Sequence, residues 1–318
     1  MPEKKLLNAE NVGEELKNVQ LSPTDVRVEV NDKFAKVIFK RDYDTSTEYK
    51  IVERKAKKSK SGKVKAKVAT NYKVTNEHGE VNIKLTEFDR AVLSVCISEQ
   101  KVGNRYTTIN MIFRALVGKV GQADDGIYPM KNQKAAIEES IKRLMGTIVD
   151  FKNLGENLKE LGYTTDAEDG NIKASSILPA ILLDCRINGQ VVKDVLYFDR
   201  ESPLLKLAEK KNQIVRYPVE LLDVPNQNNT PLIISLKTYV MRRVAEIKAH
   251  KMTPTTTFED VFAKCDVDGA SRDQKFNCRQ EVLKLFEHLE NKNFITSYEP
   301  AKRGVNVYAI KLTYNSKG

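Results

Sequence analysis

The alternation of apolar and polar positions predicts the same order of elements twice along this chain of 318 residues. Each time, apolar residues recur at helical spacing over three successive segments, and strand-like segments follow. The first set of helices is expected at 86–100, 107–117 and 131–145, with strands from Thr147 onward. The second set is expected at 231–250, 257–264 and 271–290, with strands within 294–312. The two copies share a plan rather than a sequence.

The third helix of each set has one apolar face. In the first set Ile137, Ile141, Leu144 and Ile148 follow a 4, 3, 4 spacing, so they lie on one side of the helix. In the second set the core positions fall within an arc of about 100°, and they are Cys278, Val282, Leu285, Phe286 and Leu289. The opposite face of each helix is therefore expected to be polar and exposed to solvent.

Particular residues mark where the elements start and turn. Thr86 followed by Asp89 is a capping-box-like helix start, because each side chain can bond the other's backbone amide. Pro231 suits the first position of a helix, where its missing N–H removes no hydrogen bond. Asn188-Gly189 lies between the strand-like runs 177–187 and 190–198 and predicts a β hairpin.

Three helices followed by a hairpin form a winged helix, in which one helix enters the DNA major groove and the hairpin reaches the backbone. We therefore predict an α+β fold with two winged-helix domains in tandem, at 81–225 and 226–318. Residues 1–80 are expected to form a basic, partly disordered N-terminal extension. Its segment 55–67 contains seven lysines, which repel one another. This run is either an arm that contacts phosphates or a solubilising linker.

Composition narrows the class of partner. The formal net charge of +10 favours a polyanionic partner. The four cysteines have no CxxC pairing, which indicates reduced, buried thiols in a cytoplasmic protein. No apolar run approaches the roughly 20 residues of a membrane span, and the N-terminus lacks the apolar core of a signal peptide. We therefore expect a soluble, cytoplasmic protein that does not enter the membrane.

The third helix of the second domain carries the main candidates for reading DNA bases. Asn and Gln match the hydrogen-bonding edge of adenine, whereas Arg and Lys suit guanine or phosphate. Two cations in the expected hairpin turn at 300–304, and threonines before the second helix, would meet phosphates. An ordinary solvated helix face is the alternative, and the hairpin that follows favours recognition. The candidates are Arg272, Asp273, Asn277, Arg279, Gln280, Lys284, Lys302, Arg303, Thr256 and Thr257.

The first domain offers a weaker set of candidates. At about 100° per residue, the face opposite the core of helix 131–145 presents Asn132, Ala136, Glu139 and Arg143. We expect Asn132, Lys142 and Arg143 to contact DNA, and to take over base reading if the second domain does not perform it.

The sequence lacks the motifs of nucleotide-dependent and metal-dependent enzymes. It contains no Gly-x-x-x-x-Gly-Lys-Ser/Thr loop and no HExxH, and its three histidines are isolated. His288 is expected on the polar side of its helix, where a histidine is usually inert. We therefore expect no enzyme activity, no cofactor and no bound metal.

With both domains placed, residues 80–315 resemble the plasmid replication initiators built from tandem winged helices. The resemblance rests on the segments 85–93, 232–249, 276–283, 294–295 and 304–312. It implies binding of double-stranded DNA at repeated origin sites, local DNA opening and recruitment of host replication proteins. It also implies a possible homodimer formed through the first domain, and autoregulation of the gene.

Two other classes of DNA-binding protein remain open. A winged-helix transcriptional regulator would bind an operator without initiating replication. A structural or partition-type protein would bind DNA with little sequence choice and would depend on the lysine-rich arm. A direct-repeat array beside the gene favours an initiator, whereas a single palindrome favours a regulator.

Overall fold

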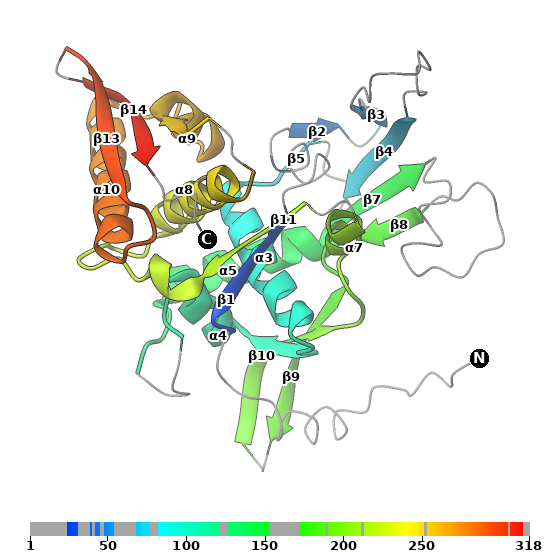
Figure 1. Ribbon diagram of the computed structural model, residues 1–318. Coiled ribbons are helices and arrows are strands. Elements are labelled where there is room, and N and C mark those ends of the chain that lie inside the picture. Colours follow the sequence, from blue (N-terminus) through cyan, green and yellow to red (C-terminus); the bar gives the residue numbers. More distant parts are fainter. Residues whose placement is uncertain are drawn as a thin grey trace.

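The structure is a computed structural model that describes residues 24–30, 39, 42–44, 48–53, 68–76, 82–120, 126–152, 172–187, 190–210, 213–250, 253–304 and 306–313. These residues form a mixed α+β fold of helices and small sheets (Figure 1). Every helix among them is too short or too polar to cross a lipid bilayer. The lysine-rich run 55–67 and the expected turn at 188–189 lie outside the described residues.

The three helices predicted for the first domain are present. The Thr86 hydroxyl accepts a hydrogen bond from the Asp89 amide at 3.2 Å, and the Asp89 carboxylate accepts one from the Thr86 amide at 2.8 Å. This reciprocal pair is the expected capping box. Gly118 ends the second helix with a φ of +86°, and an added Cβ would lie 2.1 Å from the Asp223 nitrogen. The helices are α3 (Glu87–Lys101), α4 (Ile109–Leu116) and α5 (Lys131–Gly146).

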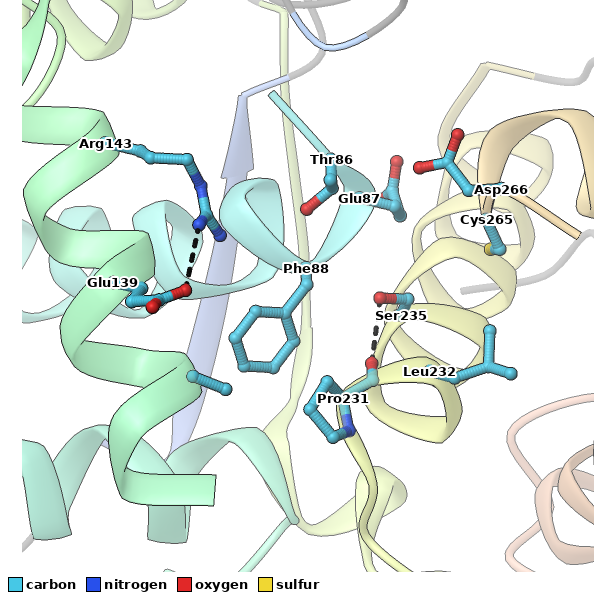
Figure 2. Close-up of a pocket in the computed structure, with 11 residues that line it drawn as sticks. Thr86, Glu87, Phe88, Glu139, Arg143, Pro231, Leu232, Ser235, Cys265 and Asp266 are labelled. Carbon is cyan, nitrogen blue, oxygen red and sulfur yellow. Dashed lines mark hydrogen bonds and ion pairs between the residues drawn. The ribbon is translucent and has the colours of Figure 1, made fainter. Parts of the chain in front are cut away.

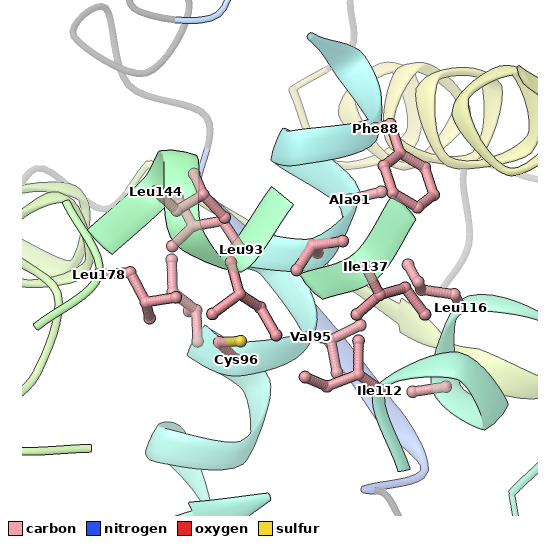
Figure 3. Packing of buried hydrophobic residues seen from close by; sticks show 14 of the residues in the cluster. Phe88, Ala91, Leu93, Val95, Cys96, Ile112, Leu116, Ile137, Leu144 and Leu178 are labelled. Atoms are coloured by element: carbon pink, nitrogen blue, oxygen red, sulfur yellow. The ribbon is translucent and has the colours of Figure 1, made fainter. Parts of the chain in front are cut away.

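The apolar faces of these three helices meet in one core. Figure 3 shows side chains of α3, α4 and α5 pointing toward one another, with Leu178 closing one side. The predicted stripe is confirmed at Ile137, Ile141 and Leu144, which are all fully buried, but its fourth member, Ile148, lies beyond the helix in strand β7 (Thr147–Lys152). Fully burying such a side chain contributes about 1.5–3 kcal/mol, so this contact fixes the orientation of α5.

Two sheets flank this core. The predicted strand 190–198 is confirmed, whereas its partner begins at Ala180 because Ile177 and Leu178 turn into the core. The polar segment before Ile177 contains a strand, at 172–176, that the sequence pattern did not predict. The first sheet has the order β6–β10–β9, with β6 (Tyr106–Thr108), β9 (Ala180–Ile187) and β10 (Gln190–Phe198). The second has the order β3–β4–β7–β8, with β3 (Glu48–Glu53), β4 (Val68–Asn76), β7 (Thr147–Lys152) and β8 (Ile172–Ser176).

One strand of the expected N-terminal extension is part of the core. β1 (Val26–Val30) pairs antiparallel with β11 (Ile214–Pro218), and its Arg27 side chain is fully buried. Arg27 donates hydrogen bonds to the carbonyl oxygens of Ala91 at 3.0 Å and Ala115 at 2.8 Å. Val26–Val30 is therefore packed with the first helices, because buried polar groups of β1 find their partners on α3 and α4. Three short elements complete this part: β2 (Asp42–Asp44), β5 (Asn82–Lys84) and α7 (Pro203–Lys210).

The second half of the chain repeats the order of the first. In each half, the short strand between the first two helices pairs with the last strand of the hairpin. The second sheet of this kind accordingly has the order β12–β14–β13, which matches β6–β10–β9. The elements of this half of the chain are η1 (Val219–Leu222), α8 (Pro231–His250), β12 (Thr255–Thr257), α9 (Phe258–Lys264), α10 (Arg272–Asn291), β13 (Ser297–Arg303) and β14 (Asn306–Thr313). We call α3 to β10 the first module and α8 to β14 the second module.

A buried ionic cluster connects α8 to the first module. Arg242 of α8 is only 3% exposed; it bonds Glu87 of α3 and lies 3.8 Å from Glu29 of β1. Glu29 also accepts hydrogen bonds from Ser94 at 2.7 Å and from Tyr217 at 3.0 Å. Burial alone would lower the pKa of Arg242, but the two carboxylates raise it above its usual value. Arg242 is therefore held in its charged form between these side chains.

Substitution of Val282 tests the predicted core face of α10, because its side chain is only 1% exposed. Val282→Ala is expected to lower the free energy of unfolding by about 2 kcal/mol, since two methyl groups leave a packed site. Chemical denaturation monitored by circular dichroism measures the change. Phe276→Ala on the same helix is the control: Phe276 is 55% exposed, and its loss should change stability by less than about 0.5 kcal/mol. Equal losses would contradict the assignment of the two faces.

Candidate nucleic-acid interface

One face of α10 is polar, exposed and without internal partners. Arg272, Asp273, Asn277 and Gln280 are all exposed, and within the described part of the chain their side chains form no hydrogen bond or ion pair. The opposite face is buried, as the sequence predicted, at Cys278, Val282, Leu285, Phe286 and Leu289. The donors and acceptors on the exposed face are therefore available to a ligand.

The start of α10 is held in a defined position. The Ser271 hydroxyl accepts a hydrogen bond from the Gln274 amide, and the Gln274 side chain accepts one from the Ser271 amide, both at 3.2 Å. The Lys275 ammonium donates to the carbonyl oxygen of Asp268 in the preceding loop. Because these contacts order the first turn, the exposed side chains project from a fixed backbone.

Two other candidates on α10 have partners within the protein. Lys284 is exposed and forms an ion pair with Glu281 at 2.7 Å. The guanidinium of Arg279 lies over the rings of Phe258 and Phe262, at 5.8 and 5.1 Å from their centroids. Arg279 was predicted to contact DNA, but cation–π contacts hold it against α9. It therefore orients α10 on α9 within the second module.

The threonine hydroxyls before α9, predicted to meet phosphate, are buried or engaged within the protein. Thr256 is 3% exposed. It lies in β12, an edge strand of the β12–β14–β13 sheet, where it pairs with Ile310 of β14. The Thr257 hydroxyl accepts from the Asp260 amide at 3.1 Å and donates to the Asp260 carboxylate at 2.7 Å. That carboxylate occupies the helix start where an anion was expected, so Thr257 serves as a cap.

Two cations lie at the end of the β13–β14 hairpin, beside α10 (Figure 1). Lys302 and Arg303 are both exposed, and they end β13 rather than standing in a turn. Gly304 follows with a φ of +61°, the left-handed conformation that glycine adopts without strain. Arg303 lies over the ring of Tyr308, 5.8 Å from its centroid. The hairpin therefore carries positive charge at its free end, and its strand β13 packs against α10.

The three candidates on α5 differ in their availability. Arg143 forms a bidentate contact with the fully buried Asp89, with nitrogen–oxygen distances of 2.8 to 3.3 Å. Figure 2 shows it beside Glu139, where α5 faces α8 across a small hollow. Arg143 therefore neutralises Asp89 and holds α5 against α3. Asn132 is exposed and accepts from the Gln133 amide at 2.9 Å, and Lys142 is exposed and lines a surface hollow together with Arg200.

His288 lies on a different side of α10 from the one predicted. It is only 8% exposed, and burial lowers the pKa of its imidazole, aided by Lys292. The segment with η1 packs against α10. A neutral, buried histidine contributes no charge to the candidate interface.

The exposed face of α10 also carries an aromatic residue, Phe276, which the sequence analysis did not include among its candidates. Its side chain is 55% exposed and forms no ring contact among the residues that the structure describes. The helical spacing contained the signal, because position 276 lies about 140° from the centre of the core stripe. An aromatic residue at such a position is either a surface exception or a contact residue.

Comparisons with known proteins yield only distant similarity. No protein-family model and no curated protein sequence matches the chain. Among solved structures, the chain is similar to a crystal structure of SeMet derivatives of domains 2 and 3 of RctB, with 15% identity and a TM-score of 0.41. That similarity covers 85% of this chain and 92% of the other. A second crystal structure of RctB domains 2–3 has 13% identity and a TM-score of 0.38, over 84% and 92% of the two chains. Similarity at this level assigns no role to any residue.

Proposed function

We propose that this chain is a double-stranded DNA-binding protein made of two winged-helix modules. The repeated sheet order, β6–β10–β9 and β12–β14–β13, supports the proposal, because each sheet follows a three-helix segment as in a winged helix. In this proposal α10 enters the major groove, which is wide enough to admit a helix, and the β13–β14 hairpin contacts the backbone. The sequence-specific element is the second module.

The exposed face of α10 is the single observation that carries this proposal. Asn277 and Gln280 have no internal partner among the described residues, and both carry the donor and acceptor pair that matches adenine N6 and N7. Arg272 adds a cation at the start of the same face, and Lys302 and Arg303 supply two more from the adjacent hairpin. Base-reading groups flanked by phosphate-binding groups are the arrangement that a DNA reader needs.

The first module has a supporting role in this proposal. Arg143 is committed to Asp89, so Asn132 and Lys142 are the groups on α5 left to contact the DNA backbone. Following the resemblance to tandem initiators, we assign dimerisation to this module as well. We further propose that the protein initiates plasmid replication at origin repeats, with host replication proteins as partners, and represses its own gene. Footprinting on the flanking DNA separates the alternatives: protection of direct repeats supports an initiator, and protection of one palindrome supports a regulator.

Alanine substitution tests the division between base reading and backbone binding. Asn277→Ala and Gln280→Ala should each weaken binding to a selected specific site by about 1–3 kcal/mol and leave binding to random duplex almost unchanged. The double substitution Lys302→Ala and Arg303→Ala should weaken binding to both, because phosphate contacts carry no sequence information. Fluorescence anisotropy with labelled duplexes measures each affinity.

A matched control uses Lys284→Ala, since Lys284 is already paired with Glu281 at 2.7 Å on the same helix. We expect Lys284→Ala to lose less affinity for the specific site than Gln280→Ala loses. If folded Asn277→Ala and Gln280→Ala variants bind their site with wild-type affinity, base reading lies elsewhere, and Asn132 and Lys142 become the leading candidates.

A further inference from the structure

Phe276 is placed where the proposed DNA reader would meet base pairs. On an α-helix with about 100° per residue, Phe276 and Asn277 flank Gln280 at about 40° and 60° around the axis. The axial separation of Phe276 and Gln280 is about 6 Å, close to two base-pair steps of 3.4 Å. The three side chains therefore form one surface that can reach neighbouring base pairs.

Several observations set Phe276 apart from other exposed apolar residues. Single exposed apolar side chains are common and need no functional explanation. Phe276 is 55% exposed, however, on the face whose polar residues Arg272, Asp273, Asn277 and Gln280 have no partners among the described residues. Tyr308 of the neighbouring hairpin is similarly exposed, at 51%, but the Arg303 guanidinium lies over its ring, 5.8 Å from the centroid. Phe276 thus offers an open apolar surface within a cluster of base-matching groups.

We infer that Phe276 reads the C5-methyl group of thymine, and that α10 recognises a site rich in A·T base pairs; this inference rests on the proposed function. In the major groove, the thymine methyl is the one apolar feature that the bases present, and a phenylalanine ring is a suitable partner for it. Asn277 and Gln280 match the adenine edge of the same type of base pair. The three residues together have the chemistry for A·T pairs, and Arg272 remains for guanine or phosphate.

The test compares thymine with uracil, which lacks only the methyl group. The full-length protein first selects its sites from a duplex library randomised over about 20 base pairs, or two helical turns. The selected duplex is then synthesised with deoxyuridine replacing thymidine at one position at a time. At the contacted position, the affinity of the wild-type protein for the deoxyuridine duplex should be about fourfold lower than for the thymidine duplex. This factor corresponds to roughly 0.8 kcal/mol for burying one methyl group.

Variants show whether Phe276 is responsible. In Phe276→Ala the affinities for the thymidine and deoxyuridine duplexes should become equal, whereas Asn277→Ala and Val102→Ala should keep the fourfold difference. Val102 is a fitting control because it is 57% exposed at the end of α3, away from α10. Since Phe276 is exposed, the variant is expected to fold, and circular dichroism verifies this.

The outcomes separate this inference from the proposed function. Site-specific binding that is insensitive to deoxyuridine at every position would overturn the inference and leave the proposed function in place. The inference would also be overturned if Phe276→Ala still bound the thymidine duplex more tightly than the deoxyuridine duplex by the same factor. Equal weakening of binding to both duplexes, which stacking on an unpaired base would predict, is one form of that result. Absence of any binding to the library would overturn both.

Discussion

Replacing Arg242 with methionine is expected to lower the free energy of unfolding by about 3–5 kcal/mol. Arg242 is 3% exposed and is the counter-charge for Glu87 and Glu29, which are 2% and 0% exposed. Methionine has a similar length and fills the space, but it leaves two carboxylates buried without that guanidinium. Breaking a buried ion pair from one side is costly because the remaining charge has no water to solvate it. Urea denaturation of the full-length variant measures the loss.

Two further variants show whether the loss comes from the uncompensated charge. Adding Glu87→Gln to Arg242→Met removes one of the stranded carboxylates and should restore part of the stability. Lys101→Met removes a cation from an exposed ion pair with Glu209, whose side chains are 39% and 31% exposed, and should cost no more than about 1 kcal/mol. If Arg242→Met costs as little as Lys101→Met, the cluster does not hold α8 against the first module.

Binding of the full chain to duplex DNA should weaken by about 10³ to 10⁵ between roughly 50 and 200 mM salt. This expectation follows if two modules together contact about six to ten phosphates and release the counterions condensed on them. The positive groups available for these contacts include Arg272, Lys302, Arg303 and Lys142, all exposed. Anisotropy titrations at a series of KCl concentrations give the slope of log affinity against log salt.

The hairpin supplies the control for this measurement. The double substitution Lys302→Ala and Arg303→Ala should reduce the magnitude of the salt slope by about two, or roughly one for each lost phosphate contact. A flat salt response, or no binding at the lowest salt concentration, would remove DNA as the partner. An unchanged slope in the double variant would show that the hairpin does not contact the backbone.

Local sequence signals predicted the helices of both modules and the strands of their hairpins, but not β1, β4, β6 or β12. The α5 stripe at Ile137, Ile141 and Leu144 and the Thr86 capping box lie where the spacing indicated. These features depend on residues within about one or two helical turns, so their periodicity can be read directly from the chain. Strand β8 was missed, since Ile172–Ser176 is short and polar and becomes a strand only by pairing with β7.

The candidate interface was predictable only in part. The exposed face of α10 follows from its core stripe, and Asn277 and Gln280 lie where the periodicity placed them. Arg143, Arg279 and Thr256 also had suitable chemistry and spacing, but each is taken up by a partner or by burial. No local pattern reveals such partners, because Arg143 and Asp89 are separated by 54 residues.

The sequence by itself determined the helices, their apolar faces, the hairpins and the repeated order of elements, because each depends on neighbours along the chain. Only the tertiary structure decided that β1 belongs to the core and that Arg242 joins α8 to the first module. It also decided which cations remain free for a ligand. The reason is physical: a buried charge must find its counter-charge or hydrogen-bond partner wherever the fold brings one. For Glu29, one such partner is Tyr217, 188 residues away in the chain.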